Sequence, residues 1–157
     1  MTLPVRLERV RRERVAVARL GVPAHVTLLY PFLTAERLDG SVRRRLARIV
    51  AGRVAWDFSL TTARRWPDAL VLDVDPREPF VRLKDDLLEA YPDFPPYGGG
   101  VPYEPHVTIA EPDETGGLPR PPLLERPLGR RVDRVAVIAL APDGRWHRHW
   151  NLALRGA

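Results

Sequence analysis

The tripeptide His-Val-Thr occurs twice in this chain, at residues 25–27 and at residues 106–108. Only four histidines are present in the 157 residues, so half of them begin the same tripeptide. Residues i and i+2 of a β-strand project from the same face, about 6.6 Å apart along the strand. The repeat therefore favours a fold with two comparable strands, each presenting one imidazole and one hydroxyl on a single face.

The segment after the first copy predicts a strand and then a helix. HVTLLYPFL is apolar and is expected to form the strand. Thr34 can cap a helix that ends at Gly52. Val42, Leu46 and Val50 share one face of that helix, and the arginines between them belong to its solvated face.

Two strands and a second helix are expected next. Residues 54–66 and 69–75 have strand composition and are separated by a Pro-Asp turn. The helix begins at Pro79, a residue suited to the first helical position, and Pro92 stops it.

The second half of the chain repeats this order of elements in a shorter form. After residues 106–108 come a Pro-rich connection, a candidate buried strand at 131–140, a turn, and a last strand at 145–154. The two tripeptides lie 81 residues apart, a period too long for a solenoid. We expect a single α+β domain over residues 1–157, with two lobes related by a pseudo-twofold axis and the tripeptides facing one cleft.

Two imidazoles that face one cleft supply a general base and a general acid, because histidine alone titrates near neutral pH without perturbation. Two threonine hydroxyls beside them can donate hydrogen bonds to the non-bridging oxygens of a phosphate. This set fits attack at phosphorus with neither a metal nor a covalent intermediate. The alternative is that threonine merely favours strands and that each histidine is structural.

GVPAHVTLLYPFL and EPHVTIAEP resemble the paired signatures of the 2H phosphoesterase superfamily, named for its two His-x-Thr/Ser motifs. The likeness is strongest to the bacterial branch of 2′-5′ RNA ligase family proteins, and it extends to PPYGGG and DGRW. It implies a bilobal α+β fold in which two antiparallel β-sheets line a central cleft, with the helices outside.

The same resemblance implies an activity and roles for four residues. The activity is metal-independent and uses no cofactor, on 2′,3′-cyclic phosphates or 2′-5′ linkages of RNA or nucleotides. By motif position, His25 and His106 are the acid–base pair, and Thr27 and Thr108 hold phosphate.

The amino-terminal segment departs from this family. Relatives usually begin with an apolar strand before the helix that precedes the first motif, whereas VRLERVRRERVAVARL corresponds mainly to that helix. Either MTLPV is a stub of the strand, or the start of this chain lies downstream of the true one. A missing strand exposes a sheet edge, which affects stability more than chemistry.

Charge and hydropathy limit the class of partner. The net charge of +5 favours an anionic substrate without naming one, and Lys84 is the only lysine among 25 basic residues, as in a GC-rich genome. The resemblance implies that the partner is an RNA end or a small cyclic nucleotide. No apolar run approaches the ~20 residues that span a bilayer, and no secretory signal is evident. We expect a cytoplasmic protein with no membrane partner; the sequence does not indicate its oligomeric state.

The glycine-rich segment PPYGGGVP has two interpretations. It is a flexible loop, or it is a flap over the cleft in which Tyr97 or Tyr103 stacks on a base. Two further functions also stay open. One is a noncatalytic module that binds RNA or nucleotides in the same cleft, and the other is an interaction domain whose arginine-rich helices meet an acidic partner.

Metal binding is the remaining alternative. His147 and His149 lie on one face of the last predicted strand, but a His-x-His pair needs further ligands. A metal held by the two tripeptide histidines would draw on Glu104, Glu111 or Asp113, and the threonines would then have no role. Zero cysteines exclude disulfides and thiolate sites.

Overall fold

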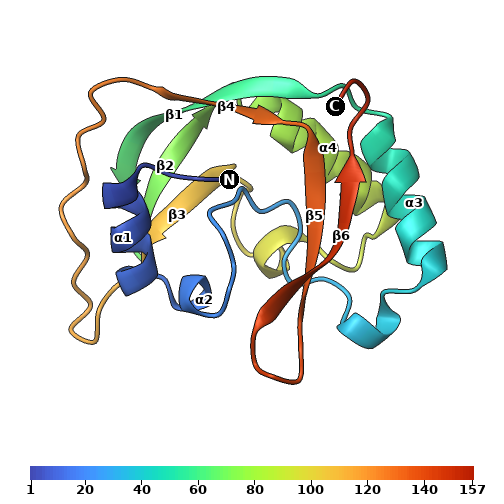
Figure 1. Cartoon of the computed structure of the whole chain (residues 1–157), viewed down its shortest axis with the longest axis horizontal. Helices are drawn as coiled ribbons and strands as arrows, with labels where there is room; N and C mark the ends of the chain where they lie inside the picture. Colours follow the sequence, from blue (N-terminus) through green and yellow to red (C-terminus); the bar gives the residue numbers. More distant parts are fainter.

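The computed structural model describes residues 1–157 as an α+β fold with two antiparallel sheets (Figure 1). The elements in chain order are α1 (Val5–Arg14), α2 (Ala16–Arg19), η1 (Ala35–Arg37, a 3₁₀ turn), α3 (Gly40–Ala51), β1 (Trp56–Arg65), β2 (Leu70–Asp75), α4 (Glu78–Ala90), η2 (Pro96–Gly99, a 3₁₀ turn), β3 (His106–Ala110), β4 (Leu128–Val132), β5 (Arg134–Leu140) and β6 (Trp146–Ala153). One sheet has the strand order β3-β2-β1-β4, and β5 pairs with β6 in the second. The predicted fold class is confirmed.

The four-stranded sheet is built around β1 and β2, which a Pro-Asp turn joins as predicted. The turn is closed by the N–H of Trp66, which donates to the carbonyl of Ala69 at 2.7 Å. Fully burying one leucine or valine side chain stabilises a fold by about 1.5–3 kcal/mol. Because many such side chains lie on the apolar face of this sheet, that face is the main source of the stability of the sheet. The core on this face consists of Leu3, Leu7, Ala24, Phe58, Leu60, Leu70, Leu72, Val74, Phe80, Val107, Ile109 and Ala110.

A second core joins α3 and α4 to the two-stranded sheet. Leu46 and Val50 of α3 pack with Leu83 of α4 and Leu152 of β6. α4 begins at Glu78, one residue before the predicted Pro79, which lies in its first turn, and it ends before Pro92 as predicted, with Tyr91 as its C-cap. The two helices thereby fix the position of β6 relative to the larger sheet.

The outer helical faces are polar. The arginines of α3, Arg43, Arg44, Arg45 and Arg48, are all exposed, which confirms the prediction of a solvated face. The longest helix has 13 residues, and no helix combines the length and the apolar character that a membrane span requires.

The first tripeptide does not lie in a strand. Residues 22–34 belong to no regular sheet, so the prediction of a strand beginning at His25 is wrong. The reason is the hydrogen bonding of its backbone. The carbonyl of Ala24 accepts from the terminal amine at 2.7 Å, and that of Thr27 accepts from the Tyr103 hydroxyl at 2.8 Å. Isolated donors therefore take the place of a neighbouring strand.

The helix predicted from Thr34 begins later, at Gly40. Asp39 provides the cap, because its carboxylate accepts from the N–H groups of Ser41 at 2.7 Å and Val42 at 2.9 Å. Residues 35–37 form only a 3₁₀ turn. The stronger of two available caps, and not the first, decides the start of α3.

The strand predicted at 131–140 is divided between the two sheets at Asp133. The chain ends β4 beside β1, and β5 begins one residue later beside β6. The carbonyl of Asp133 accepts from the N–H of Leu154 at 2.9 Å and stabilises the crossing point. Both strands consist of exposed and half-buried residues, so the expectation of one buried strand is wrong.

Each tripeptide contacts strands from the other half of the sequence. β3, which contains the second copy, pairs with β2. The segment around the first copy contacts β6, where the N–H of Trp146 donates to the carbonyl of Leu20 at 2.8 Å and its ring lies 6.4 Å from that of Tyr30. The four-stranded sheet therefore combines strands from both halves of the chain, and the two-stranded sheet of the second half packs against a segment of the first (Figure 1).

Candidate functional site

The second tripeptide is presented by β3. Val107 and Ile109 are fully buried in the core, so the alternating residues His106 and Thr108 lie on the opposite face of the strand, where both are half-buried. His106 is the partner of Asp73 in the β2–β3 ladder. The predicted pairing of imidazole and hydroxyl on one face is therefore present here.

The first tripeptide keeps the same alternation without a strand. Val26 and Leu28 pack against the main core. The residues that alternate with them, His25 and Thr27, are half-buried. The residue before the motif, Ala24, is fully buried. Packing of every second residue, and not a ladder of hydrogen bonds, holds this segment in place.

Both imidazoles have the same hydrogen-bond partner, the carbonyl two residues earlier. Nδ1 of His25 lies 2.8 Å from the oxygen of Pro23, and Nδ1 of His106 lies 2.6 Å from the oxygen of Glu104. A carbonyl only accepts, so in each ring Nδ1 donates, and Nε2 of the neutral ring is left as the proton acceptor. Two rings with a fixed tautomer and an available Nε2 suit proton transfer.

Two tyrosines of the glycine-rich segment connect the tripeptides. The Tyr103 hydroxyl donates to the carbonyl of Thr27 at 2.8 Å. The Tyr97 ring stacks on His106, with centroids 6.3 Å apart and planes at 27°. The pKa of Tyr97 is raised by burial and lowered to a smaller extent by a hydrogen bond from the Thr27 side chain, which places its hydroxyl beside that residue. Each sequence-predicted tyrosine thus touches a predicted catalytic motif.

The two histidines differ in their charged neighbours. Burial is the main cause that lowers the pKa of His25, and the cations of Arg11, the amino terminus and His106 lower it further. Burial also lowers the pKa of His106, but the carboxylates of Glu104 and Asp73 act in the opposite direction. The two imidazoles are close enough for their charges to interact, and their charged neighbours differ: cations act on His25, whereas carboxylates and Arg64 act on His106.

An ionic network that the sequence did not reveal surrounds His106. Arg64 contacts Asp73 at 3.0 Å and Glu104 at 2.6 Å, and Arg77 contacts the same two carboxylates at 3.4 and 3.5 Å. The Trp66 ring covers His106 with centroids 4.4 Å apart. The pairing of β2 with both β1 and β3 brings these residues together, so no local pattern could have identified them.

The three carboxylates that a metal site at the tripeptide histidines would draw on are bound to other groups. Glu104 lies in the ionic network, Glu111 accepts from the N–H of Ala16 at 2.8 Å, and Asp113 accepts from the N–H of Gly117 at 2.8 Å. No group of three or more histidine, aspartate and glutamate side chains is arranged to hold a metal ion. The structure does not favour that alternative.

His147 and His149, both on β6, contact different residues. His147 lies 3.0 Å from a carboxylate oxygen of Asp143, and the His149 ring packs edge-on against Trp150 at 4.6 Å. A register shift in the β5–β6 ladder falls at this point, between Val137 and Ile138. Both histidines are exposed and belong to the edge of the hairpin.

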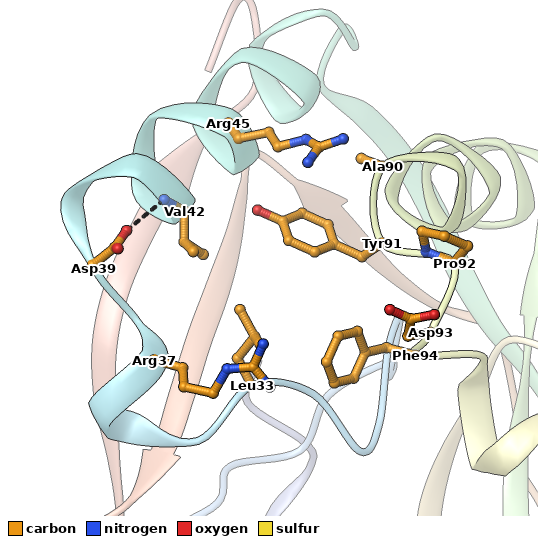
Figure 2. A pocket seen from close by; sticks show the side chains of 10 residues that line it. All are labelled: Leu33, Arg37, Asp39, Val42, Arg45, Ala90, Tyr91, Pro92, Asp93 and Phe94. Carbon is orange, nitrogen blue, oxygen red and sulfur yellow. Dashed lines mark hydrogen bonds between the residues drawn. The ribbon is translucent and has the colours of Figure 1, made fainter.

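A cavity of about 440 Å³ lies between η1, the start of α3 and the end of α4 (Figure 2). Arg45 lies over the Tyr91 ring at 5.0 Å there, and the side chains of Arg37 and Asp93 also line it. A second cavity of about 300 Å³ lies beside residues 61–63 and 121–124. Neither contains a residue of the two tripeptides, so the candidate site is defined by the histidines and not by these hollows.

Comparison with known proteins agrees with the fold. The family described as the 2′-5′ RNA ligase superfamily matches residues 2–144. The protein TT0787 of Thermus thermophilus is similar in structure with a TM-score of 0.65 and 22% identity, covering 98% of this chain and 94% of that one. No curated protein matches.

Two further solved structures are similar over nearly their whole length. E. coli LigT, crystallised in complex with 3′-AMP, has a TM-score of 0.60 and 17% identity, covering 98% of this chain and 94% of that one. A protein described as a phosphoesterase has a TM-score of 0.59 and 16% identity, covering 99% of this chain and 95% of that one. At these identities the likeness establishes the fold alone.

Proposed function

Because this chain belongs to the 2′-5′ RNA ligase superfamily, we propose that it is a phosphoesterase acting on 2′,3′-cyclic phosphates or 2′-5′ phosphodiester bonds of RNA or nucleotides. The observation that supports this most is the matched pair of Nδ1 bonds at His25 and His106, which leaves an Nε2 atom available on each ring. Neither a metal nor an organic cofactor is needed for the chemistry that this pair can perform.

Hydrolysis of a cyclic phosphate requires two proton transfers. One imidazole accepts a proton from water as the water oxygen bonds to phosphorus, and the other donates a proton to the ribose oxygen as its bond to phosphorus breaks. Thr27 and Thr108 donate hydrogen bonds to the non-bridging oxygens, where negative charge develops. In ligation a 5′-hydroxyl takes the place of water: one imidazole accepts its proton as its oxygen bonds to phosphorus, and the other donates a proton to the ribose oxygen whose bond to phosphorus breaks. Cleavage of the 2′-5′ bond to a cyclic phosphate is the reverse of ligation, and in it the two imidazoles exchange roles.

Nucleotide recognition is proposed on two grounds. E. coli LigT, which has a similar fold, binds 3′-AMP, and we extend nucleotide binding to this chain. The Tyr97 ring is 38% exposed and stacks on His106, so its outer side can accept a base beside the reacting phosphate.

The test is a screen of purified protein against 2′,3′-cyclic nucleotides and 2′-5′ dinucleotides, in buffer containing EDTA. We expect turnover of at least one substrate in the chelator, lost in H25A and in H106A and retained in the matched control H147A. Binding without turnover of any substrate would support the noncatalytic nucleotide-binding module instead. Activity that disappears in EDTA and returns with zinc or manganese would support the metal alternative.

A further inference from the structure

Arg11 of α1 is the one charged side chain that is fully buried, with 2% of its surface exposed. Burying a guanidinium is costly unless it is paired and hydrogen-bonded. Its nearest carboxylate, that of Glu8, is 4.0 Å away, at the limit of an ion pair, and its Nε atom has no hydrogen-bond partner. Pairing with an acid therefore does not explain why an arginine is buried here.

The contacts of Arg11 lead to the first tripeptide. One terminal nitrogen donates to the carbonyl of Val22 at 3.0 Å and the other donates to the carbonyl of Pro23 at 3.1 Å. The Pro23 oxygen is also the acceptor for Nδ1 of His25, at 2.8 Å. One oxygen is thus shared between a permanent cation and the imidazole.

This sharing has two physical consequences. The guanidinium fixes the carbonyl in the position where it accepts from His25, which holds Nδ1 as the protonated nitrogen and leaves Nε2 as the acceptor. The guanidinium also opposes a second positive charge on the ring. The other charged group facing His25, the terminal amine bound to Ala24, acts in the same direction, as does His106 when protonated.

The surroundings of His106 have the opposite character. Its Nδ1 donates to the carbonyl of Glu104, and no arginine bonds that oxygen. The carboxylates of Glu104 and Asp73 both face the ring and favour its positive form, while Arg64 and Arg77 neutralise part of their charge. Two titratable groups whose environments differ in this way have different pKa values, which suits one to act as the base and the other as the acid.

We propose that Arg11 is a positioning residue that holds His25 as the neutral Nδ1–H tautomer, so that in hydrolysis His25 accepts the proton of the attacking water and His106 donates a proton to the leaving oxygen. This assignment rests on the proposed function and deepens it. The protons balance: His25 Nε2 takes one from the attacking water, and His106 Nε2 gives one to the leaving oxygen. Afterwards His25 releases its added proton to solvent, and His106 takes a proton from solvent.

Three variants test the role of Arg11 in the rate. R11M removes the cation and the donors at similar length, R11K keeps the cation with a single donor group, and R12M is the matched control on the exposed side of α1. We expect R11M to lower kcat/KM on the order of 10²-fold, the cost of misplacing a reacting group by about 1 Å. R11K should recover part of this loss, and R12M should not change the rate.

The pH profile tests the assignment of base and acid. Loss of the Arg11 cation makes His25 easier to protonate, and a protonated base is inactive, so the acidic side of the kcat/KM profile should move to higher pH in R11M. The alkaline side, which reports His106, should stay in place. Movement of the alkaline side alone would overturn the assignment, and a lower rate with neither side displaced would reduce Arg11 to a structural residue.

Imidazole NMR provides a readout that does not require activity. The His25 resonances, assigned by their loss in H25A, should titrate at higher pH in R11M and show a mixture of tautomers, while His106 is unchanged. An unchanged titration and tautomer of His25 in a folded R11M protein would overturn the proposal. If no substrate is turned over but His25 responds in this way, the proposed function fails and the effect of Arg11 on His25 stands.

Discussion

The imidazoles of His25 and His106 have the same backbone partner and different charged neighbours. At the scale of single residues, this combination means that the two rings have similar orientation but unequal affinity for a proton. A bell-shaped dependence of kcat/KM on pH is expected. Its two apparent pKa values are those of the coupled pair, and under the proposed assignment changes near His25 move mainly the acidic side and changes near His106 mainly the alkaline side.

Replacement of the tripeptide residues should separate proton transfer from phosphate binding. H25A and H106A should each lower kcat/KM on a cyclic nucleotide by about 10²–10⁴, the usual effect of one positioned proton-transfer group. The double variant should lose less than the product of the two, because groups that act together are not additive. T27V and T108V should cost only about 2- to 12-fold, since each removes one neutral hydrogen bond. Full activity of either histidine variant on every accepted substrate would exclude the acid–base pair.

Glu104 should control the alkaline side of the pH profile. Its carboxylate favours protonated His106, so E104Q lowers the pKa of His106, and a deprotonated acid is inactive. Activity should therefore fall at a lower pH in E104Q than in the wild type, with the acidic side unchanged. E114Q, at an exposed position after β3, is the control. The experiment compares kcat/KM across pH for the three proteins, and an unmoved alkaline side would separate Glu104 from His106.

At the scale of elements, the glycine-rich segment and the cap of α3 have distinct roles. Tyr97 has a φ of 54°, in the left-handed region that favours glycine. Its N–H donates to the carbonyl of Tyr30 at 2.7 Å and holds the residue in place. A large aromatic residue held in this conformation beside His106 is consistent with a functional need for its ring.

Removal of that ring should weaken nucleotide binding. Base–aromatic stacking is worth about 1–3 kcal/mol per base, so Y97A should raise KM by about 5- to 150-fold. Y97F keeps the ring and should bind almost as the wild type does. Steady-state kinetics on a cyclic nucleotide distinguishes the two, and a KM unaffected by Y97A would mean that the base lies elsewhere.

The cap of α3 should contribute to stability and not to chemistry. D39A removes the acceptor of the Ser41 and Val42 N–H groups and should lower the free energy of unfolding by about 1 kcal/mol. D93A, in the exposed turn after α4, should change it much less. Urea denaturation measures both. Equal midpoints for D39A and the wild type would assign the start of α3 to packing alone.

At the scale of the whole molecule, the interleaving of the two halves predicts one cooperative unit. Neither half can bury its apolar residues alone, because β3 pairs with β2 and the first tripeptide contacts β6. Unfolding should therefore follow a single transition, with far-UV circular dichroism and the fluorescence of the four tryptophans changing at the same denaturant concentration. Two separated transitions would show independent lobes.

Local patterns predicted the parts of the fold that local patterns control. β1, β2, α4 and β6 follow from alternation, helical spacing and turn residues, and the paired His-x-Thr motifs led to residues that Tyr97 and Tyr103 connect. The division at Asp133 could not be predicted, since strand propensity continues through it and only the two sheets determine where β4 ends. Arg11 was equally hidden, because an arginine in a charged helix has no local sign of burial.

The interleaved order of strands also has a consequence during synthesis. His25 leaves the ribosome early, but the β6 residue Trp146 that its segment contacts is made more than 100 residues later. At a synthesis rate of about 5–20 residues per second, on the order of 10 s passes between the synthesis of His25 and that of Trp146. β2 and β3 can therefore pair in a nascent chain before the segment around the first tripeptide has its contact with β6. We therefore expect the proposed activity only once β6 has been made, and a chain that ends before β6 should show none in the substrate screen.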